Sequence, residues 1–290
     1  MTTPLPLDRI AGAPISWGLC EVPGWGYQLT PERVLGEMRD LGLPATEFGP
    51  PGFLEPDAAA RVAQLGEYGL RAVGGFYLAL LHDPGHDPLP GVDAFVGECL
   101  AAGAGVVVLA AYTGSEGYDE RPVLDDQGWA TLLGNLDRLA DHARSRGVEA
   151  VIHPHVGTMV ENAAEVQRVT EGSHIGLCLD TGHLAAAGAD PVAIARAHPE
   201  RVRHVHLKDV DGALAAQVAA GSLAFGDAVR AGMFRPLGQG DVDIAGMVQT
   251  LEGAGYDGWY VLEQDVMLAG DPSGEGPLAD VRTSLDFLVA

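Results

Sequence analysis

Residues 202–209 read VRHVHLKD, a strand-like stretch that carries His206 near its end. Three more stretches share this character, namely AVIHPH at 150–155, IGLCLD at 175–180 and WYVLE at 259–263. Short apolar runs of this kind are typical of strands buried on both faces of a parallel sheet. Each run reaches a side chain that can bind a metal: His153, Asp180, His206 and Glu263. One ligand per successive strand end predicts a divalent-metal site at the mouth of a parallel β/α barrel.

Strand-like and amphipathic stretches alternate along the whole chain, as expected for parallel strands joined by crossover helices. The sequence predicts eight strands, at 10–17, 44–49, 70–77, 105–111, 148–153, 174–180, 202–207 and 258–263. It predicts helices between them at 31–42, 56–68, 91–103, 126–146, 161–171, 190–199, 242–254 and 278–289. Eight such units in 290 residues indicate a (β/α)8 TIM barrel, which typically needs about 250 residues.

Local signals support these helix boundaries. Thr30 and Pro31 fit the cap and the first position of the first helix. The glycines in RDLGL (39–43) and RSRGVE (144–149) fit left-handed helix ends just before a strand.

No linker divides the chain, so we predict a single domain over residues 1–290. Residues 211–241, after the seventh strand, are too long for a simple βα loop. Such an insertion on the catalytic face either shapes the substrate pocket or makes an oligomer contact.

The composition excludes some kinds of partner. There are 17 Lys and Arg against 40 Asp and Glu, a formal charge of -23 that repels nucleic acid and anionic membranes. The N-terminus lacks the features of a signal peptide, and no apolar stretch approaches the roughly 20 residues that span a bilayer. The three cysteines, an odd number without a CxxC pair, are expected to be reduced. We therefore expect a cytoplasmic protein that acts on a small molecule.

Imidazole and carboxylate ligands together suit manganese, iron, cobalt or zinc better than calcium. Other polar residues surround the predicted ligands. His155 shares the inward face with His153, and Lys208 shares that of His206, because side chains alternate along a strand. A buried lysine beside a dication is costly unless it faces a developing anion, which makes Lys208 a functional candidate. The remaining candidates are Glu47 at the end of strand two, Trp17 at the end of strand one and His183 in a loop above the metal.

Two further motifs are weaker signals. HDPGHDP at 82–88 contains two histidines, but its prolines and glycine favour a surface loop. PLGQGD at 236–241 does not open a helix as a phosphate-binding loop would. It is more typical of a turn, from which Gln239 could reach the substrate.

The chain resembles the xylose-isomerase-like barrel superfamily of sugar isomerases and epimerases. The resemblance is carried by DTGH (180–183), HVHLKDV (204–210), GQGDVDI (238–244) and GYDGWYVLEQD (255–265). Within the superfamily, GAPISWG (12–18), TEFGPPGF (46–53) and HPHVGTMVE (153–161) are similar to the inosose dehydratase family. That resemblance implies a lyase that removes water from 2-keto-myo-inositol in inositol breakdown, with Mn²⁺ or Co²⁺ as the leading candidates for its metal and Zn²⁺, Fe²⁺ or Mg²⁺ as alternatives.

One departure from the superfamily pattern bears on the reaction. Most of the isomerases and epimerases that resemble this chain carry Glu-Pro where it has His153-Pro154. Their two metal-bound glutamates stand on opposite faces of the substrate, one removing a proton and the other returning it. Only Glu263 remains of that pair, which implies elimination rather than epimerisation. The change leaves His153 and His155 as candidates for the same ligand position.

The implied mechanism begins with a cyclic polyol ketone that chelates the metal, which acts as a Lewis acid. Glu263, Glu47 or a neutral Lys208 could remove the adjacent proton. A charged Lys208 would instead neutralise the developing enediolate. His155, His183 or Glu47 could protonate the leaving hydroxyl.

The alternatives are a metal-dependent sugar isomerase or ketose 3-epimerase, and a sugar-binding barrel without catalysis. An abasic-site nuclease would need a basic groove to bind DNA, and the strongly negative net charge of this chain argues against that function.

Overall fold

The computed structural model describes residues 4–115 and 117–290, and in this part of the chain nine parallel strands lie side by side. Their order is β3-β2-β1-β11-β8-β7-β6-β5-β4. Only Val73 separates β3 from β4 along the chain, so the two ends of the sheet belong to one interrupted strand and the barrel closes. The strands are β1 (Ile10–Gly12), β2 (Ala45–Thr46), β3 (Arg71–Ala72), β4 (Gly74–Ala79), β5 (Val106–Ala111), β6 (Glu149–Ile152), β7 (Gly176–Asp180), β8 (Val202–Leu207) and β11 (Tyr260–Leu262). The predicted TIM barrel is confirmed.

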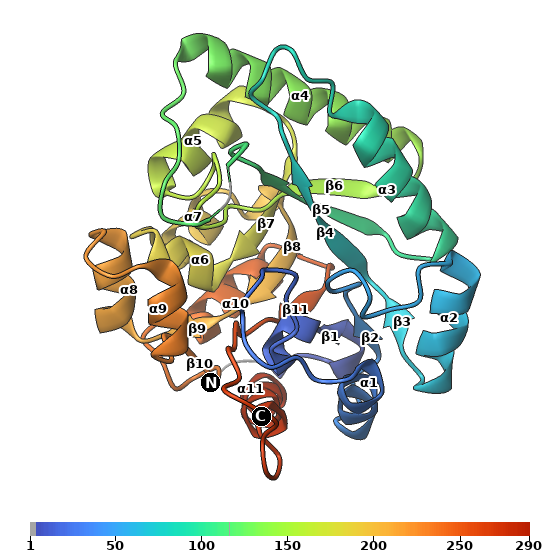
Figure 1. Cartoon of the computed structure of the whole chain (residues 1–290). Helices are drawn as coiled ribbons and strands as arrows, with labels where there is room; N and C mark the ends of the chain where they lie inside the picture. The colour runs from blue at the N-terminus through green and yellow to red at the C-terminus, as the bar shows by residue number, and fades with distance from the viewer. Residues whose placement is uncertain (1–3, 116) are drawn as a thin grey trace.

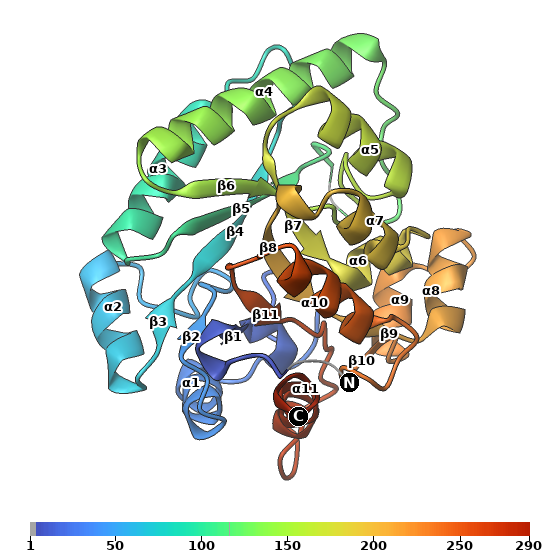
Figure 2. The same cartoon turned by 180° about the vertical axis from the view of Figure 1, so that it is seen from behind.

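Helices surround the barrel on its outside (Figures 1 and 2). They are α1 (Pro31–Asp40), α2 (Ala58–Glu67), α3 (Leu89–Ala101), α4 (Asp126–Ser145), α5 (Ala163–Gly172), α6 (Thr181–Ala186), α7 (Pro191–Ala197), α8 (Gly212–Ala219), α9 (Phe225–Arg230), α10 (Ile244–Gly253) and α11 (Pro277–Val289). Short 3-10 turns lie at Leu7–Arg9, Pro14–Trp17 and Pro199–Arg201.

The eight predicted helices lie within two residues of their predicted bounds, whereas α6, α8 and α9 were not predicted. The Thr30 side chain accepts a hydrogen bond from the Arg33 amide, and Pro31 is the first residue of α1. Asn162 and Glu165 form a reciprocal capping box at the start of α5. Gly42 follows α1 with a φ of 77°, a left-handed conformation that favours glycine.

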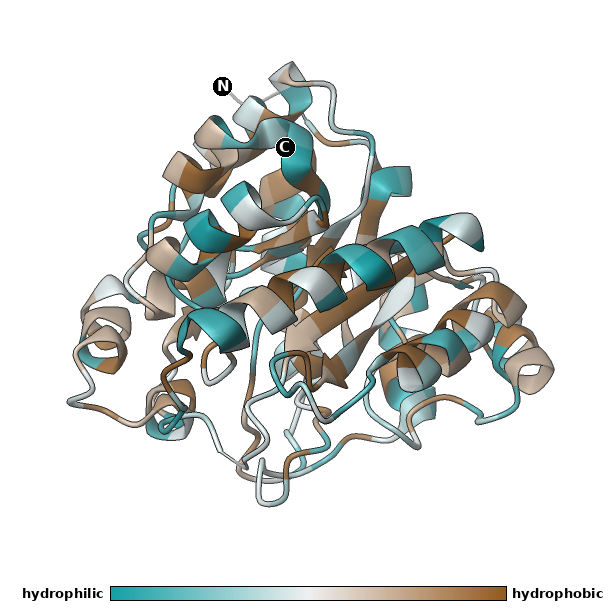
Figure 3. Cartoon of the chain, turned by 90° about the horizontal axis from the view of Figure 1, so that it is seen from above, coloured by the Kyte–Doolittle hydropathy of each residue, from teal (hydrophilic) through white to brown (hydrophobic). Residues whose placement is uncertain are grey.

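The apolar residues form the layer between strands and helices. Leu132, Leu136 and Leu139 of α4 are fully buried at helical spacing. In Figure 3 the strands at the centre are largely brown, while teal residues lie on the surrounding helices. Within the described ranges, no helix combines the length and the apolar character that a bilayer crossing requires.

Strand one is shorter than predicted. It ends at Gly12 and not at Trp17, because residues 14–17 turn into a 3-10 helix that begins with Pro14. Trp17 is fully buried, and its indole Nε1 donates to Glu37 of α1 at 2.7 Å. This contact lies between the barrel and an outer helix. The prediction that strand one ends at Trp17 was therefore wrong; the Trp17 side chain packs against α1, and its predicted contact with substrate stays a prediction.

The insertion at 211–241 folds into α8, α9 and β10 (Phe234–Arg235), and β10 pairs antiparallel with β9 (Asp209–Val210), which lies just before the insertion. Phe225 and Phe234 pack in one apolar cluster with Trp25. Their rings lie 5.6 Å and 6.0 Å from the ring of His183. The insertion thus forms a wall beside a candidate site residue, whereas an oligomer contact stays a prediction.

Candidate metal centre

Four predicted ligands, from four neighbouring strands, converge at one point. His153 follows β6, Asp180 ends β7, His206 lies in β8 and Glu263 follows β11. Asp180 Oδ2 is 3.1 Å from His153 Nε2 and 3.5 Å from His206 Nδ1. His206 Nδ1 also contacts Glu263 Oε2. The carboxyl ends of parallel strands meet at one barrel mouth, which is why residues 110 positions apart in sequence become neighbours.

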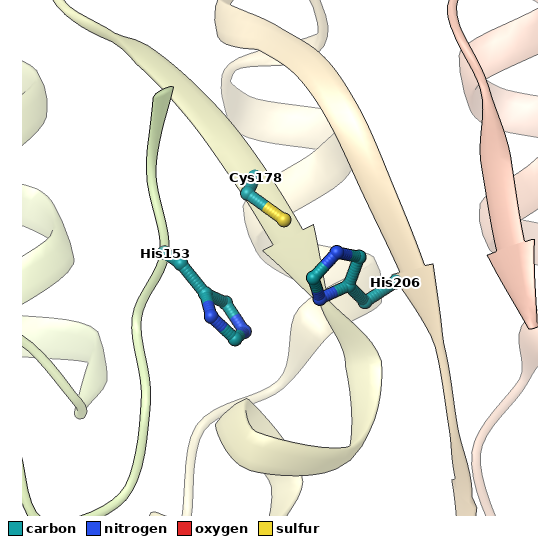
Figure 4. Close-up of side chains that lie close together, drawn as sticks. All are labelled: His153, Cys178 and His206. Carbon is teal, nitrogen blue, oxygen red and sulfur yellow. The ribbon is translucent and has the colours of Figure 1, made fainter. Parts of the chain in front are cut away.

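A cysteine lies directly beside this cluster. The side chains of His153, Cys178 and His206 point toward one another (Figure 4), and their ligand atoms lie within 4.8 Å of each other. The same limit holds for ligand atoms of Asp180, His206 and Glu263. Cys178 is fully buried and is a free thiol.

Glu47 lies on the other side of the His206 ring. Its Oε1 is 2.8 Å from His204 Nε2 and 3.1 Å from His206 Nε2. Burial alone would raise the pKa of Glu47, but the two imidazoles outweigh that effect and lower it far below its ordinary value. An ionised carboxylate that already accepts two hydrogen bonds is a poor general base, so this position argues against Glu47 as the base.

Lys208 is 1% exposed and is surrounded by carboxylates. Its Nζ lies 2.9 Å from Asp265 Oδ1, 3.2 Å from Asp180 Oδ2 and 3.4 Å from Glu263 Oε2. Burial alone would lower the pKa of Lys208, but these anions raise it well above its ordinary value. The lysine is therefore an ammonium ion at neutral pH.

The donor atoms fit a divalent ion. Glu263 Oε2 and His206 Nδ1 are buried beside each other, and neither has a hydrogen-bond partner among the described residues. Burial alone would lower the pKa of His206, but nearby groups, Glu263 and Glu47 among them, raise it well above its ordinary value, so a proton lies between the two atoms unless a metal ion replaces it. Excess negative charge points the same way, because three carboxylates lie around the single Lys208 ammonium, those of Asp180, Glu263 and Asp265, and a fourth, that of Glu47, contacts His206. A dication would reduce this excess.

The DTGH motif at 180–183 explains how the site is held. The sequence predicted a loop for DTGH, but the segment is the start of α6, with Asp180 as its N-cap. Asp180 Oδ1 accepts a hydrogen bond from the His183 amide at 2.7 Å, which leaves Oδ2 for the cluster. Thr181 Oγ1 donates to the Lys208 carbonyl and accepts from the Lys208 amide. A Cβ on Gly182 would lie 2.4 Å from Lys208 Cβ, so only glycine lets the two segments approach this closely.

His155 and His183 form a wall beside the predicted ligands. Their ring centroids are 3.6 Å apart, with Tyr118 stacked on His155 and Phe225 on His183. His155 Nδ1 donates to the carbonyl of Val156, and burial lowers the pKa of His155 to about 3. Burial also lowers the pKa of His183 well below its ordinary value. Both rings are neutral, and of the pair His153 and His155, the geometry favours His153 as the ligand.

Gln239 is exposed and lies on a turn. Asp209 explains the turn, because its carboxylate accepts from the amides of Gly238, Gly240 and Val242. Gly238 itself packs closely on Phe287 of α11. The turn prediction for PLGQGD is confirmed, whereas a role for Gln239 toward substrate stays a prediction.

Three residues of the site were missed by the sequence prediction, namely Cys178, His204 and Asp265. Each lies two positions from a predicted ligand: Asp180, His206 and Glu263. The alternation that pointed to His155 and Lys208 could therefore have found them too.

The fold and this cluster define a TIM-barrel protein with a candidate metal centre at the carboxyl ends of its strands. The chain belongs to the xylose isomerase-like TIM barrel family, whose sequence model matches residues 35–290.

Curated relatives give a finer picture. The chain is 31% identical over 268 residues to an inosose dehydratase of Geobacillus thermodenitrificans, covering 89% of each chain. It is 34% identical over 280 residues to the rhizopine catabolism protein MocC of Rhizobium meliloti, covering 93% of this chain and 84% of that protein. Among solved structures, the IolI protein with a bound zinc atom has a TM-score of 0.70 at 15% identity, with 97% of this chain and 98% of that chain covered. At that identity the structural likeness shows the fold.

Proposed function

We propose that this protein is a divalent-metal-dependent lyase that dehydrates a keto-cyclitol such as 2-keto-myo-inositol. The observation that carries the proposal is the contact of one ionised carboxylate, that of Glu263, with one buried ammonium, that of Lys208. At the end of β6, where a second carboxylate base would be needed for epimerisation, the chain has the imidazole of His153. Removing a proton once and expelling hydroxide needs a single base. The inosose dehydratase relatives support the substrate class.

The ligands in this proposal are His153, Asp180, His206 and Glu263. A Mn²⁺ or Co²⁺ ion held there would supply Lewis acidity toward the ketone and a neighbouring hydroxyl. The donor set of two imidazoles and two carboxylates suits such ions.

Glu263 is the general base. Burial alone would raise the pKa of Glu263, but His206 and Lys208 outweigh it and lower that pKa. The carboxylate is thus ionised at neutral pH and can take the proton from the carbon next to the ketone. Lys208 is charged, so it does not act as a base but stabilises negative charge that develops on the ketone oxygen.

The leaving group departs as water. As the carbon–carbon double bond forms, the C–O bond to the β-hydroxyl breaks and its electron pair leaves with oxygen. His155 and His183 are neutral and hold substrate hydroxyls by hydrogen bonds. The protonated Glu263 returns its proton to the departing oxygen on the same face, which balances the loss of one water molecule.

The proposal is tested by incubating Mn²⁺- or Co²⁺-loaded protein with 2-keto-myo-inositol and, separately, with a panel of ketohexoses. Dehydration creates a conjugated dione that absorbs in the ultraviolet, and Glu263→Gln should abolish this signal. Glu37→Gln is the matched control, since Glu37 accepts from Trp17 outside the site. Interconversion of ketohexoses without an ultraviolet product would instead establish the isomerase or 3-epimerase alternative.

A further inference from the structure

Two buried residues, Glu47 and His204, lie on the side of the His206 ring that faces away from the other predicted ligands. Glu47, His204 and His206 are 4%, 0% and 1% exposed, so bulk water does not compete for their hydrogen bonds. We propose that Glu47 and His204 are positioning residues that fix the tautomer and the ring orientation of His206, so that Nδ1 faces the metal. This inference rests on the metal centre of the proposed function.

The tautomer follows from the hydrogen bonds. The contact of 3.1 Å between His206 Nε2 and Glu47 Oε1 requires a proton on Nε2, because an ionised carboxylate only accepts. The lone pair of a neutral ring is then on Nδ1. That atom contacts Glu263 Oε2 and lies 3.5 Å from Asp180 Oδ2. All three atoms are electron-pair donors that converge on one point, as ligands of a cation do.

His204 keeps Glu47 in place. His204 and His206 lie two residues apart on β8 and therefore on the same face of the strand. Both rings donate from Nε2 to the same Glu47 oxygen, at 2.8 Å and 3.1 Å. Without His204, the buried Glu47 carboxylate would lose the shorter of these two hydrogen bonds. A carboxylate that orients a metal-bound imidazole is a common way to tune a metal site.

The contact crosses the barrel interior. Glu47 follows β2, whereas β8 is separated from β2 by β1 and β11. The Glu47 amide donates to the Gly12 carbonyl of β1, which fixes its backbone. Glu47 thus reaches His206 from rigid strands, and the ring cannot turn over without breaking this hydrogen bond.

A competing interpretation is that Glu47, His204 and His206 hold an ion of their own, because their ligand atoms also lie within 4.8 Å of one another. His206 Nδ1 already faces Glu263 Oε2 and Asp180 Oδ2, so its Nε2 is the protonated nitrogen when an ion is bound there, which favours the positioning role. The two interpretations differ in the number of ions bound per chain.

The test compares metal affinity in the full-length protein. The ion is removed with a chelator, and Co²⁺ binding is measured by competition for wild type, Glu47→Gln and His204→Asn. Both variants should bind about 10- to 100-fold more weakly than wild type. Glu37→Gln and His174→Asn, which alter a carboxylate and a histidine outside the site, should bind like wild type.

Nuclear magnetic resonance of ¹⁵N-histidine-labelled, Zn²⁺-loaded wild type provides a measurement that does not depend on variants folding. His206 should show a proton on Nε2 and metal-bound Nδ1. The opposite tautomer, unchanged affinity in folded Glu47→Gln, or a second ion that His204→Asn removes would each overturn the inference. If wild type itself binds no ion, the proposed function fails instead.

Discussion

Lys208 Nζ lies 2.9 Å from Asp265 Oδ1, deep in the barrel mouth, and no other lysine occurs in the sequence. The other 16 basic residues that carry a permanent charge are arginines. A lysine ammonium is a compact point charge, whereas an arginine needs space for a planar fork. The one lysine of this chain is therefore placed where a small cation is required, among Asp180, Glu263 and Asp265.

The charge state of Lys208 can be observed directly. Protein labelled with ¹⁵N at the lysine side chain should give one Nζ signal, and we expect it to remain that of an ammonium above the ordinary pKa of 10.5. The sign is that of a raised pKa: the stabilisation from Lys208 is complete below the unfolded pKa and is lost as the pH rises through the folded value. Titration of Nζ below the ordinary pKa would instead support the alternative in which a neutral Lys208 is the general base.

Replacing Lys208 should separate metal binding from catalysis. Lys208→Met removes a positive charge beside the centre, so a divalent ion should bind more tightly while kcat falls by about 100-fold or more. Lys208→Arg should not restore activity, because the Lys208 ammonium is buried among three close carboxylates and a planar guanidinium needs more space. Weaker ion binding in Lys208→Met would show that the ammonium does not lie next to the metal.

Asp180 has two separable roles. Asp180→Asn keeps an oxygen to cap α6 but loses the charge of Oδ2, so ion binding should fail while the apo protein stays nearly as stable. Asp180→Ala loses the cap as well and should cost about 1 kcal/mol more in free energy of unfolding. Urea denaturation of both variants after chelation measures this difference. Equal stabilities would mean that the cap contributes nothing.

Gly182 should tolerate no side chain. Its φ is not in the left-handed region, so the backbone accepts alanine, but the new Cβ would lie 2.4 Å from Lys208 Cβ. Gly182→Ala should therefore displace the Lys208 side chain and lower kcat with little effect on Co²⁺ affinity. Gly134→Ala, at a helix position with open space, is the control. Full activity in Gly182→Ala would contradict the tight fit.

The buried imidazoles should make the fold sensitive to acid. Burial lowers the pKa of His155 to about 3, so between that value and its ordinary pKa of 6.5 only the unfolded chain takes up the proton. Stability should be level above the ordinary pKa and should fall as the pH drops through this window. His155→Phe, which keeps a ring against Tyr118, should show a shallower decline between about pH 7 and about pH 5 in urea denaturation. An identical decline would assign the acid sensitivity to other groups.

The local pattern predicted the parts of the site that depend on strand ends. His153, Asp180, His206 and Glu263 were predicted together because each closes a strand-like run, and parallel strands bring such ends to one rim. Lys208 followed from alternation along β8. These inferences use only short-range spacing and the geometry of a barrel.

Contacts across the barrel could not be predicted in this way. The pairing of Glu47 with His204 joins residues 157 positions apart, and no local pattern encodes it. Trp17 was misplaced because Pro14 opens a 3-10 turn where an apolar run had suggested a continued strand. The folding of the insertion into α8, α9 and a small sheet depends on burial against the barrel, which its own sequence does not reveal.

The sequence by itself determined the eightfold alternation of strands and helices and the ligand-bearing strand ends, because side-chain periodicity and turn residues act over a few positions. The tertiary structure alone decided which atoms face each other: Glu47 behind His206, Asp265 beside Lys208, and Trp17 turned outward to α1. The physical reason is that buried charges and hydrogen bonds are satisfied by whatever side chains the closed barrel brings within reach.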